Sequence, residues 1–254
     1  TYSRLIFPIL LIPLVIFFSI KLGLFAIKQV EVEGKELSCV SNNQLIKASG
    51  IYGQNFFFLN SVKITDNLKR KYLCIKSVDI EKALPNKVKL QLTDRQPLAK
   101  LINLKEKEAT TSSLIESIAT PSAENIGDSY LVDDESVVFA KDIDEITLPK
   151  IYIYKKFSLG DNLKDNLIGQ ALEILKKIKL FNVNISQSFI DGSFLIIGQQ
   201  GAGPTIVFSL EQDIKIQLGS LQLILTETKI NAEELEFIDL RFDKPIIKIA
   251  PKKK

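Results

Sequence analysis

A long uncharged apolar run near the N-terminus constrains this chain more than any other feature. Residues Leu5–Ile20 carry no charge, and after Lys21 the apolar run resumes over Leu22–Ile27. A helix over residues 5–27 would be about 34 Å long, enough for a hydrocarbon core of about 30 Å. The sequence therefore predicts a membrane anchor at Leu5–Ile27, in contact with the lipid bilayer through one helix.

Two alternatives fit the same run less well. A cleaved signal peptide would end at a small-residue site, which Phe25-Ala26-Ile27-Lys28 does not provide. A buried core helix would need other segments to cover it on all sides. Arg4 is the one charge among the first four residues, so charge alone does not settle which end of the anchor faces the cytoplasm.

The charge balance argues against a nucleic-acid partner. The 254 residues include 33 Lys plus Arg and 30 Asp plus Glu, a formal net charge of +3. Arginine, which reads phosphates and guanine with two parallel hydrogen bonds, occurs at Arg4, Arg70, Arg95 and Arg241 alone. We expect no nucleic-acid binding.

The absence of histidine removes most catalytic and metal chemistry. With no His in the chain, Ser-His-Asp and Cys-His systems and His-containing zinc sites are excluded. The two cysteines, Cys39 and Cys74, cannot form a four-thiolate site; they are either two small semi-buried residues or one disulfide. No Ser-x-x-Lys motif occurs. We therefore expect no catalytic residue, metal, cofactor or small-molecule substrate, and no enzyme activity.

The region after the apolar run predicts a small α+β domain. Alternation and capping signals indicate a strand at 29–34, helices at 42–49 and 62–72, and a strand hairpin at 75–81 and 88–92. Within it we expect Val62, Leu68 and Tyr72 to face inward and Phe56, Phe57 and Phe58 to belong to the core.

The second region predicts a mixed α/β domain after a flexible insert. Residues 105–128 are rich in Ser, Thr, Ala and Glu without sustained periodicity, which is typical of a loop. Short strands at 129–139 flank an acidic turn, Asp133-Asp134-Glu135, which we interpret as a solvated hairpin tip. Further along, the pattern predicts helices at 163–181 and 213–224, the latter with Ile216, Leu218, Leu221 and Leu225 as apolar contacts, and strands at 183–190, 194–197 and 205–209. The glycines of 198–203 precede a strand rather than a helix, so we expect a hairpin loop and no phosphate site.

The final apolar segment contains a proline directly before Ile246 and Ile247. In the segment 237–249, Pro245 cannot donate a ladder hydrogen bond, so the neighbouring strand must lie at a sheet edge or a bulge. An edge that contains Ile246, Ile247 and Ile249 is either protected or used to add a strand from a partner.

The order of short motifs resembles the bacterial cell-division family FtsQ/DivIB, with a POTRA domain after the anchor. The resemblance is carried by Val30–Gly34, Ala48–Gly50, Asn55–Phe57, Ile75–Val78, Leu84–Pro85, Asp94–Ala99, Leu131–Phe139, Leu148–Pro149 and Ile238–Phe242. Two positions depart from the family pattern, with Asp94 in place of Glu and Ser136 in place of Gly.

The resemblance implies a domain organisation and a cellular location. It implies an α+β chain with an anchor at 1–27, a POTRA domain at 28–97, a β domain with an antiparallel-rich sheet and two helices at 98–250, and a basic tail at 251–254. It also implies a single-pass inner-membrane protein with its N-terminus in the cytoplasm and the bulk of the chain outside, at the division site.

The implied partners are FtsB- and FtsL-like bitopic proteins and a septal cell-wall synthase, with control of septal peptidoglycan synthesis. By correspondence with the family, the partner-binding residues are Phe242, Asp243, Lys244, Ile246, Ile247 and Ile249. We expect Arg241 and Asp239 to be structural, either forming a local ion pair or fixing the end of the strand. Two alternatives stay open: a POTRA-containing chaperone or scaffold of a protein export or outer-membrane assembly system, and an enzyme acting on the cell wall.

Overall fold

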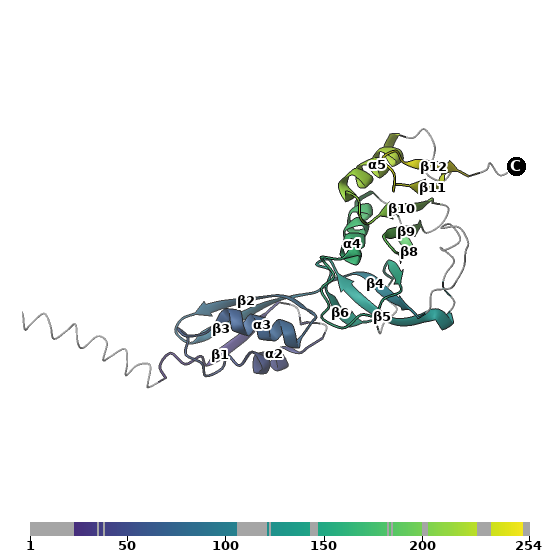
Figure 1. Cartoon of the computed structure of the whole chain (residues 1–254). Coiled ribbons are helices and arrows are strands. Elements are labelled where there is room, and N and C mark those ends of the chain that lie inside the picture. The colour runs from purple at the N-terminus through teal and green to yellow at the C-terminus, as the bar shows by residue number, and fades with distance from the viewer. Residues whose placement is uncertain are drawn as a thin grey trace, which may run out of the picture. The chain divides into compact units, whose positions relative to one another are not determined.

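The computed structural model of the chain divides into two compact units, with the boundary in the sequence between Arg95 and Gln96 (Figure 1). The structure describes residues 23–34, 36–37, 39–105, 121, 123–142, 147–181, 183, 185–199, 203–227 and 235–250. Most of the predicted anchor, the centre of the predicted insert and the basic tail 251–254 lie outside these ranges. Over the described ranges, none of the helices combines the length and apolar character that crossing a bilayer requires.

The predicted anchor was drawn too far along the chain. Residues 23–25 form a turn, and Ala26 makes an antiparallel bridge with Asn55. Ile27 is buried in the core of the first unit. Phe25 packs against the same core, so the apolar character of Phe25 and Ile27 serves the folded unit, a reason that a hydropathy pattern cannot distinguish from burial in lipid.

The first unit has the predicted strand-helix-helix-strand-strand order. Its elements are β1 (Gln29–Glu33), α2 (Asn42–Ser49), α3 (Ser61–Lys71), β2 (Ile75–Ala83) and β3 (Lys87–Asp94). The sheet order is β1-β3-β2, with β1 parallel and β2 antiparallel to β3. The helices and the sheet enclose one core that includes Leu45, Leu68, Ile75, Val88 and Leu90.

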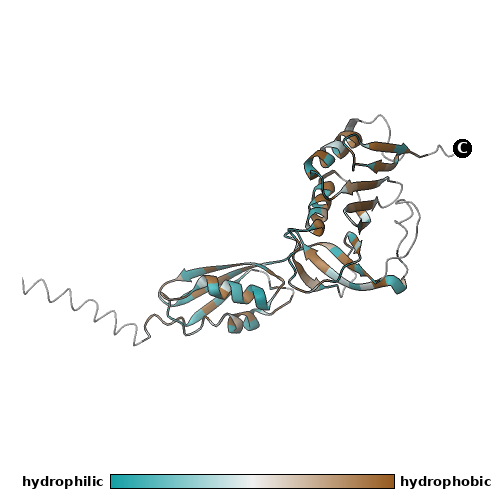
Figure 2. Ribbon diagram, viewed as in Figure 1, coloured by the Kyte–Doolittle hydropathy of each residue, from teal (hydrophilic) through white to brown (hydrophobic). Residues whose placement is uncertain are grey.

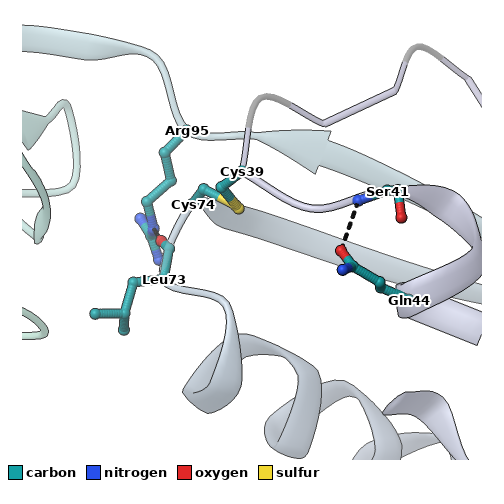
Figure 3. Close-up of a disulfide and its surroundings, with 6 residues drawn as sticks. All are labelled: Cys39, Ser41, Gln44, Leu73, Cys74 and Arg95. Atoms are coloured by element: carbon teal, nitrogen blue, oxygen red, sulfur yellow. Dashed lines mark hydrogen bonds between the residues drawn. A yellow bond between two sulfur atoms is a disulfide. The ribbon is translucent and has the colours of Figure 1, made fainter. Parts of the chain in front are cut away.

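Side-chain and backbone caps close the ends of the two helices, and α3 covers Ser61–Lys71 where 62–72 was predicted. At α2, the Ser41 amide donates to the Gln44 Oε1 at 3.3 Å, and Gly50 ends the helix with φ +61° (Figure 3). At α3, the Asn60 side chain accepts from the Lys63 amide at 3.0 Å.

Several predicted core positions of the first unit were wrong. Val62 is exposed and Ile64 is buried together with Leu68, because Ile64 and Leu68 are four residues apart and share a face that Val62 does not. Phe56 is buried, whereas Phe57 and Phe58 are exposed. The side chains of three consecutive residues in an irregular loop point in different directions, so only one of the three phenylalanines enters the core.

A disulfide joins Cys39 to Cys74, with 6.3 Å between their Cα atoms (Figure 3). The sequence left this pairing open against two unpaired cysteines. The bond ties the segment before α2 to the residue that precedes β2. Next to it, the Arg95 Nε donates to the Leu73 carbonyl at 3.1 Å, so both chain segments at this end of the unit are held.

The second unit is built on a nine-stranded sheet of the described residues. Its strands are β4 (Pro97–Leu104), β5 (Ile126–Asp133), β6 (Val138–Lys141), β7 (Lys150–Ile153), β8 (Ile185–Asp191), β9 (Phe194–Gln199), β10 (Thr205–Ser209), β11 (Leu235–Asp239) and β12 (Ile246–Ile249). The strand order is β12-β11-β10-β9-β8-β7-β4-β5-β6. Antiparallel pairs are in the majority, and β4–β7, β7–β8 and β10–β11 are parallel.

Two helices pack against this sheet, α4 (Leu167–Ile178) and α5 (Ile214–Glu227). Figure 2 shows strands β9 and β10 of the sheet as mostly hydrophobic. The prediction started α4 too early, at Leu163. The helix begins after Asn166, whose Oδ1 accepts from the amides of Ile168 and Gly169 at 2.9 and 3.2 Å. Leu163 is buried before the helix, and a Cβ at Gly169 would collide with its carbonyl oxygen.

The acidic hairpin tip is not fully solvated, which corrects the sequence interpretation. Asp133 is buried, and its Oδ1 accepts from the amides of Glu135 and Val137 at 3.0 and 2.8 Å. Ser136 has φ +65°, a left-handed conformation that favours glycine. The strand that leads into this turn, β5, starts at Ile126, inside the stretch predicted as an insert.

Candidate interaction surface at the C-terminal sheet edge

Strand β12 lies at one end of the nine-stranded sheet, and among the described residues it pairs with β11 alone (Figure 1). Ile247 is opposite Ile238 and Ile246 is opposite Asp239. No residue of β12 is buried: Ile246 and Ile249 are each 53% exposed. In the described part of the chain, no strand pairs with the other long side of β12, which offers a row of backbone donors and acceptors with isoleucine side chains on both faces.

The bend between β11 and β12 is held by an ion pair. The Arg241 Nε donates to the Asp239 Oδ1 at 2.9 Å, and its Nη2 contacts the Oδ2 at 2.6 Å. The Asp239 Oδ1 also accepts from the Arg241 amide at 3.1 Å. This two-pronged contact confirms the predicted local ion pair, and its hydrogen bonds raise the pKa of the Arg241 guanidinium.

The same guanidinium positions an exposed aromatic ring. The Arg241 Cζ lies 4.8 Å from the centroid of the Phe194 ring and 5.6 Å from that of Phe242. Phe194 belongs to β9, so the ion pair is anchored on the sheet. Phe242 is half exposed, and its ring is stacked on a charged group that Asp239 already orients.

A hollow of about 270 Å³ adjoins this bend. Phe242 and Asp243 line it on one side, and the first turns of α5 line it on the other. Ile216 on α5 lines the hollow and is exposed, contrary to the prediction that it packs inward. The remaining lining residues are Gln212, Asp213, Gln217, Ser220 and Leu240.

The outward position of Ile216 could have been predicted from its spacing in the sequence. Leu218, Leu221 and Leu225 follow three- and four-residue steps and face the core of the second unit. Ile216 precedes Leu218 by two residues, which on a helix places it about 200° away. Its contribution to a surface near Phe242 required knowledge of the fold.

The structure gathers the predicted site residues in one region of the surface. Phe242 and Asp243 line the hollow, and Ile246, Ile247 and Ile249 form the adjoining edge. Lys244 is exposed in the same bend but does not line the hollow. Beside the edge, the Lys248 Nζ pairs with the Glu236 Oε1 at 2.8 Å.

This arrangement is suited to binding an extended chain. Within the described ranges, no three acidic or cysteine side chains gather as a metal site would require. The surface instead combines an open backbone edge, exposed isoleucines and one oriented aromatic ring.

Comparison with known proteins bears on the first unit. Residues 25–95 match the family described as POTRA domain, FtsQ-type. That range agrees with the first unit, whose last residue is Arg95. No curated protein matches the chain.

Proposed function

The chain carries an FtsQ-type POTRA domain at residues 25–95, and on this basis we propose that it is a non-enzymatic scaffold of the bacterial division machinery. The domain type supports a protein-interaction role in cell division at the level of the family. In this proposal the apolar segment from Leu5 anchors the chain in the cell membrane once, with the N-terminus in the cytoplasm. The POTRA domain and the β domain at 98–250 then lie outside, at the division site.

The observation that carries the finer proposal is the open edge of β12. Its three isoleucines are unburied within the chain, although they are among the best strand formers and most apolar side chains available. An extended segment of a partner that pairs with β12 would use the free backbone groups and cover these side chains. We assign this segment to FtsB- and FtsL-like bitopic proteins, whose binding helps control septal peptidoglycan synthesis, with a septal cell-wall synthase as a further partner.

The bend before β12 adds an anchor for the same segment. A rigid aromatic side chain next to a hollow is a frequent centre of binding energy in protein interfaces. Phe242 meets that description because Arg241 and Asp239 hold it in place before any partner arrives. Asp243 and Lys244 lie beside it with opposite charges and would select the partner's polar side chains.

The test measures binding of the full chain, in detergent or nanodiscs, to the extracytoplasmic segments of FtsB- and FtsL-like proteins of the same genome. Phe242→Ala should weaken binding by about tenfold or more, equivalent to about 1.4 kcal/mol. Leu180→Ala, at an exposed leucine of the 3-10 turn Lys179–Phe181, is the matched control and should leave the affinity unchanged.

Two proline variants test the backbone edge directly. Neighbouring strand residues direct their amides to opposite sides, so of Ile247 and Lys248 one donates toward β11 and the other toward the open edge. Proline at whichever of the two residues donates toward the open edge should abolish binding and leave the melting temperature unchanged. Unaltered binding in both variants would refute strand addition at β12. Absence of binding by the unmodified chain would favour the export or outer-membrane assembly role.

A further inference from the structure

One end of the POTRA domain combines features that the proposed partner surface does not use. This entry end consists of residues 23–28, 52–63 and 82–87, where the chain enters β1 (Figure 1). Backbone hydrogen bonds hold the three segments together. The Phe56 amide donates to the Phe25 carbonyl at 2.8 Å, and the Lys28 amide donates to the Asn86 carbonyl at 2.9 Å. The Lys82 Nζ reaches the Leu59 carbonyl at 3.2 Å.

The entry end holds every large apolar or tyrosine side chain that is exposed in the described part of this domain. These six side chains are between 56% and 73% exposed, and they are Leu24, Tyr52, Phe57, Phe58, Val62 and Leu84. They come from three separate segments, so their concentration at one end is a property of the fold. The Phe57 ring also packs edge-on against Phe25 and Phe56, at 4.9 and 5.5 Å between centroids, which gives this surface a rigid base.

The charged residues of the entry end are all lysines. Its 24 residues include Lys28, Lys63, Lys82 and Lys87 and no aspartate or glutamate, and of these Lys87 pairs with Glu31 of β1 at 2.7 Å. In the whole chain the two signs are nearly balanced, 33 against 30. Aromatic and aliphatic side chains among lysines, without acids, are the composition that favours the interface of a bilayer containing anionic lipids.

The position of this surface in the chain selects the bilayer over other occupants. Gly23 follows the apolar run of Leu5–Ile20 by only two residues, Lys21 and Leu22. Through the contacts of Phe25 and Ile27, the loop 52–58 is bonded to the residues directly after that run. We propose that the POTRA domain docks through its entry end onto the anionic membrane surface, with Phe58, Val62, Leu24 and Leu84 inserted at the level of the headgroups. The inference rests on the membrane anchor of the proposed function.

Docking of this kind would restrict the orientation of the POTRA domain relative to the membrane. A domain that only followed an anchor through a flexible joint would sample many orientations. Insertion of side chains from 52–63 and 82–87, in addition to the chain entry, makes three separated contacts with the surface and fixes the direction in which β1 leaves the membrane.

The chain contains no tryptophan, which makes a direct test possible. Phe58→Trp and Leu84→Trp each introduce one fluorophore at the entry end. Lys71→Trp is the control, at the exposed last residue of α3, about 15 Å along that helix from Ser61. The full chain is reconstituted in nanodiscs of phosphatidylglycerol and phosphatidylcholine, with and without bromine on the acyl chains.

We expect bromine to reduce the fluorescence of Phe58→Trp and Leu84→Trp by about twofold and that of Lys71→Trp hardly at all. Replacing the exposed Lys28 and Lys63 with glutamine, or omitting phosphatidylglycerol, should weaken the quenching. Equal quenching at all three positions would contradict a specific docking face.

Two failures are distinguishable. If the chain inserts into the discs but Phe58→Trp and Leu84→Trp are unquenched, the docking inference is wrong while the anchor stands, and the apolar patch is left for a protein partner. If the chain does not enter the discs, both the anchor and the docking are overturned. Partner binding through β12 is measured separately and is independent of either result.

Discussion

Strands β10 and β12 are similar in composition and opposite in situation. β10 reads Thr-Ile-Val-Phe-Ser and β12 reads Ile-Ile-Lys-Ile, both typical strand sequences. β10 lies between β9 and β11, and Ile206, Val207 and Phe208 are fully buried. β12 has one neighbour and no buried residue. The same kind of side chain therefore stabilises the fold in one strand and is available to a partner in the other.

The two strands also differ in how their backbone groups are satisfied. At the end of β10, the Gln217 side chain on α5 accepts from the Ser209 amide at 2.8 Å and donates to the Ser209 carbonyl at 2.9 Å. The buried Gln217 amide therefore satisfies the backbone groups of Ser209, at the point where the strand pairing of β10 ends. The open side of β12 faces no strand in the described part of the chain. The comparison predicts that substitutions in β10 act on stability and substitutions in β12 act on binding.

The largest effect is expected from Phe208→Ala. Removing a fully buried phenylalanine loses its transfer free energy and leaves a cavity, so the free energy of unfolding should fall by about 3–5 kcal/mol. Urea unfolding followed by circular dichroism measures it. Phe242→Ala makes the same chemical change at the sheet edge and should cost less than about 1 kcal/mol. Equal losses of unfolding free energy in the two variants would contradict the contrast between the sheet interior and the sheet edge.

A smaller effect is expected from Gln217→Ala. The amide and carbonyl of Ser209 would both lose a buried partner, and the free energy of unfolding should fall by about 1–3 kcal/mol. Gln222→Ala, at an exposed position of the same helix, controls for the change in helix propensity and in side-chain length. Urea unfolding of the two variants gives the difference. A stability equal to that of the Gln222 variant would show that Ser209 finds other partners.

The smallest effect on stability is expected from Ile246→Thr combined with Ile249→Thr. Threonine keeps the β-branched shape but lowers apolar area at two exposed positions, so the free energy of unfolding should change by no more than about 0.5 kcal/mol. The same variant should bind the partner segments more weakly. Ile206→Thr in β10 is the internal reference and should destabilise clearly. A large loss of stability in the β12 variant would mean that this strand is part of the core.

Much of the first unit was predictable because its signals are local. Period-two alternation, Asn60 and Gly50 at helix ends, and the Leu84–Lys87 turn each act within a few residues. The order of its elements was therefore correct. The errors arose where a local pattern had two physical explanations, as for Ile27, which is apolar because it lies in the folded core, and Phe58, which is apolar and exposed.

The second unit was predictable in its elements and less so in their roles. Asp133 reads as a surface residue until the backbone amides that it accepts from are known. Ile216 lies two residues before Leu218 and so on another face of α5, but only the fold places it in a hollow beside Phe242. The burial of Asp133 and the surroundings of Ile216 depend on the tertiary structure, whereas the hydrogen bonds of Asp133 and the offset of Ile216 are local.

The sequence by itself determined that the chain alternates apolar strands with amphipathic helices, that it lacks the groups for His-based chemistry, and that a proline precedes its last strand. These properties depend on residue type and spacing alone. Only the tertiary structure decided that β12 lies at the end of the sheet and β10 in its interior, and that Phe242 stacks on Arg241 beside α5. The reason is physical: strand order arises from pairings between distant segments, and exposure depends on which of them occupy the neighbouring positions.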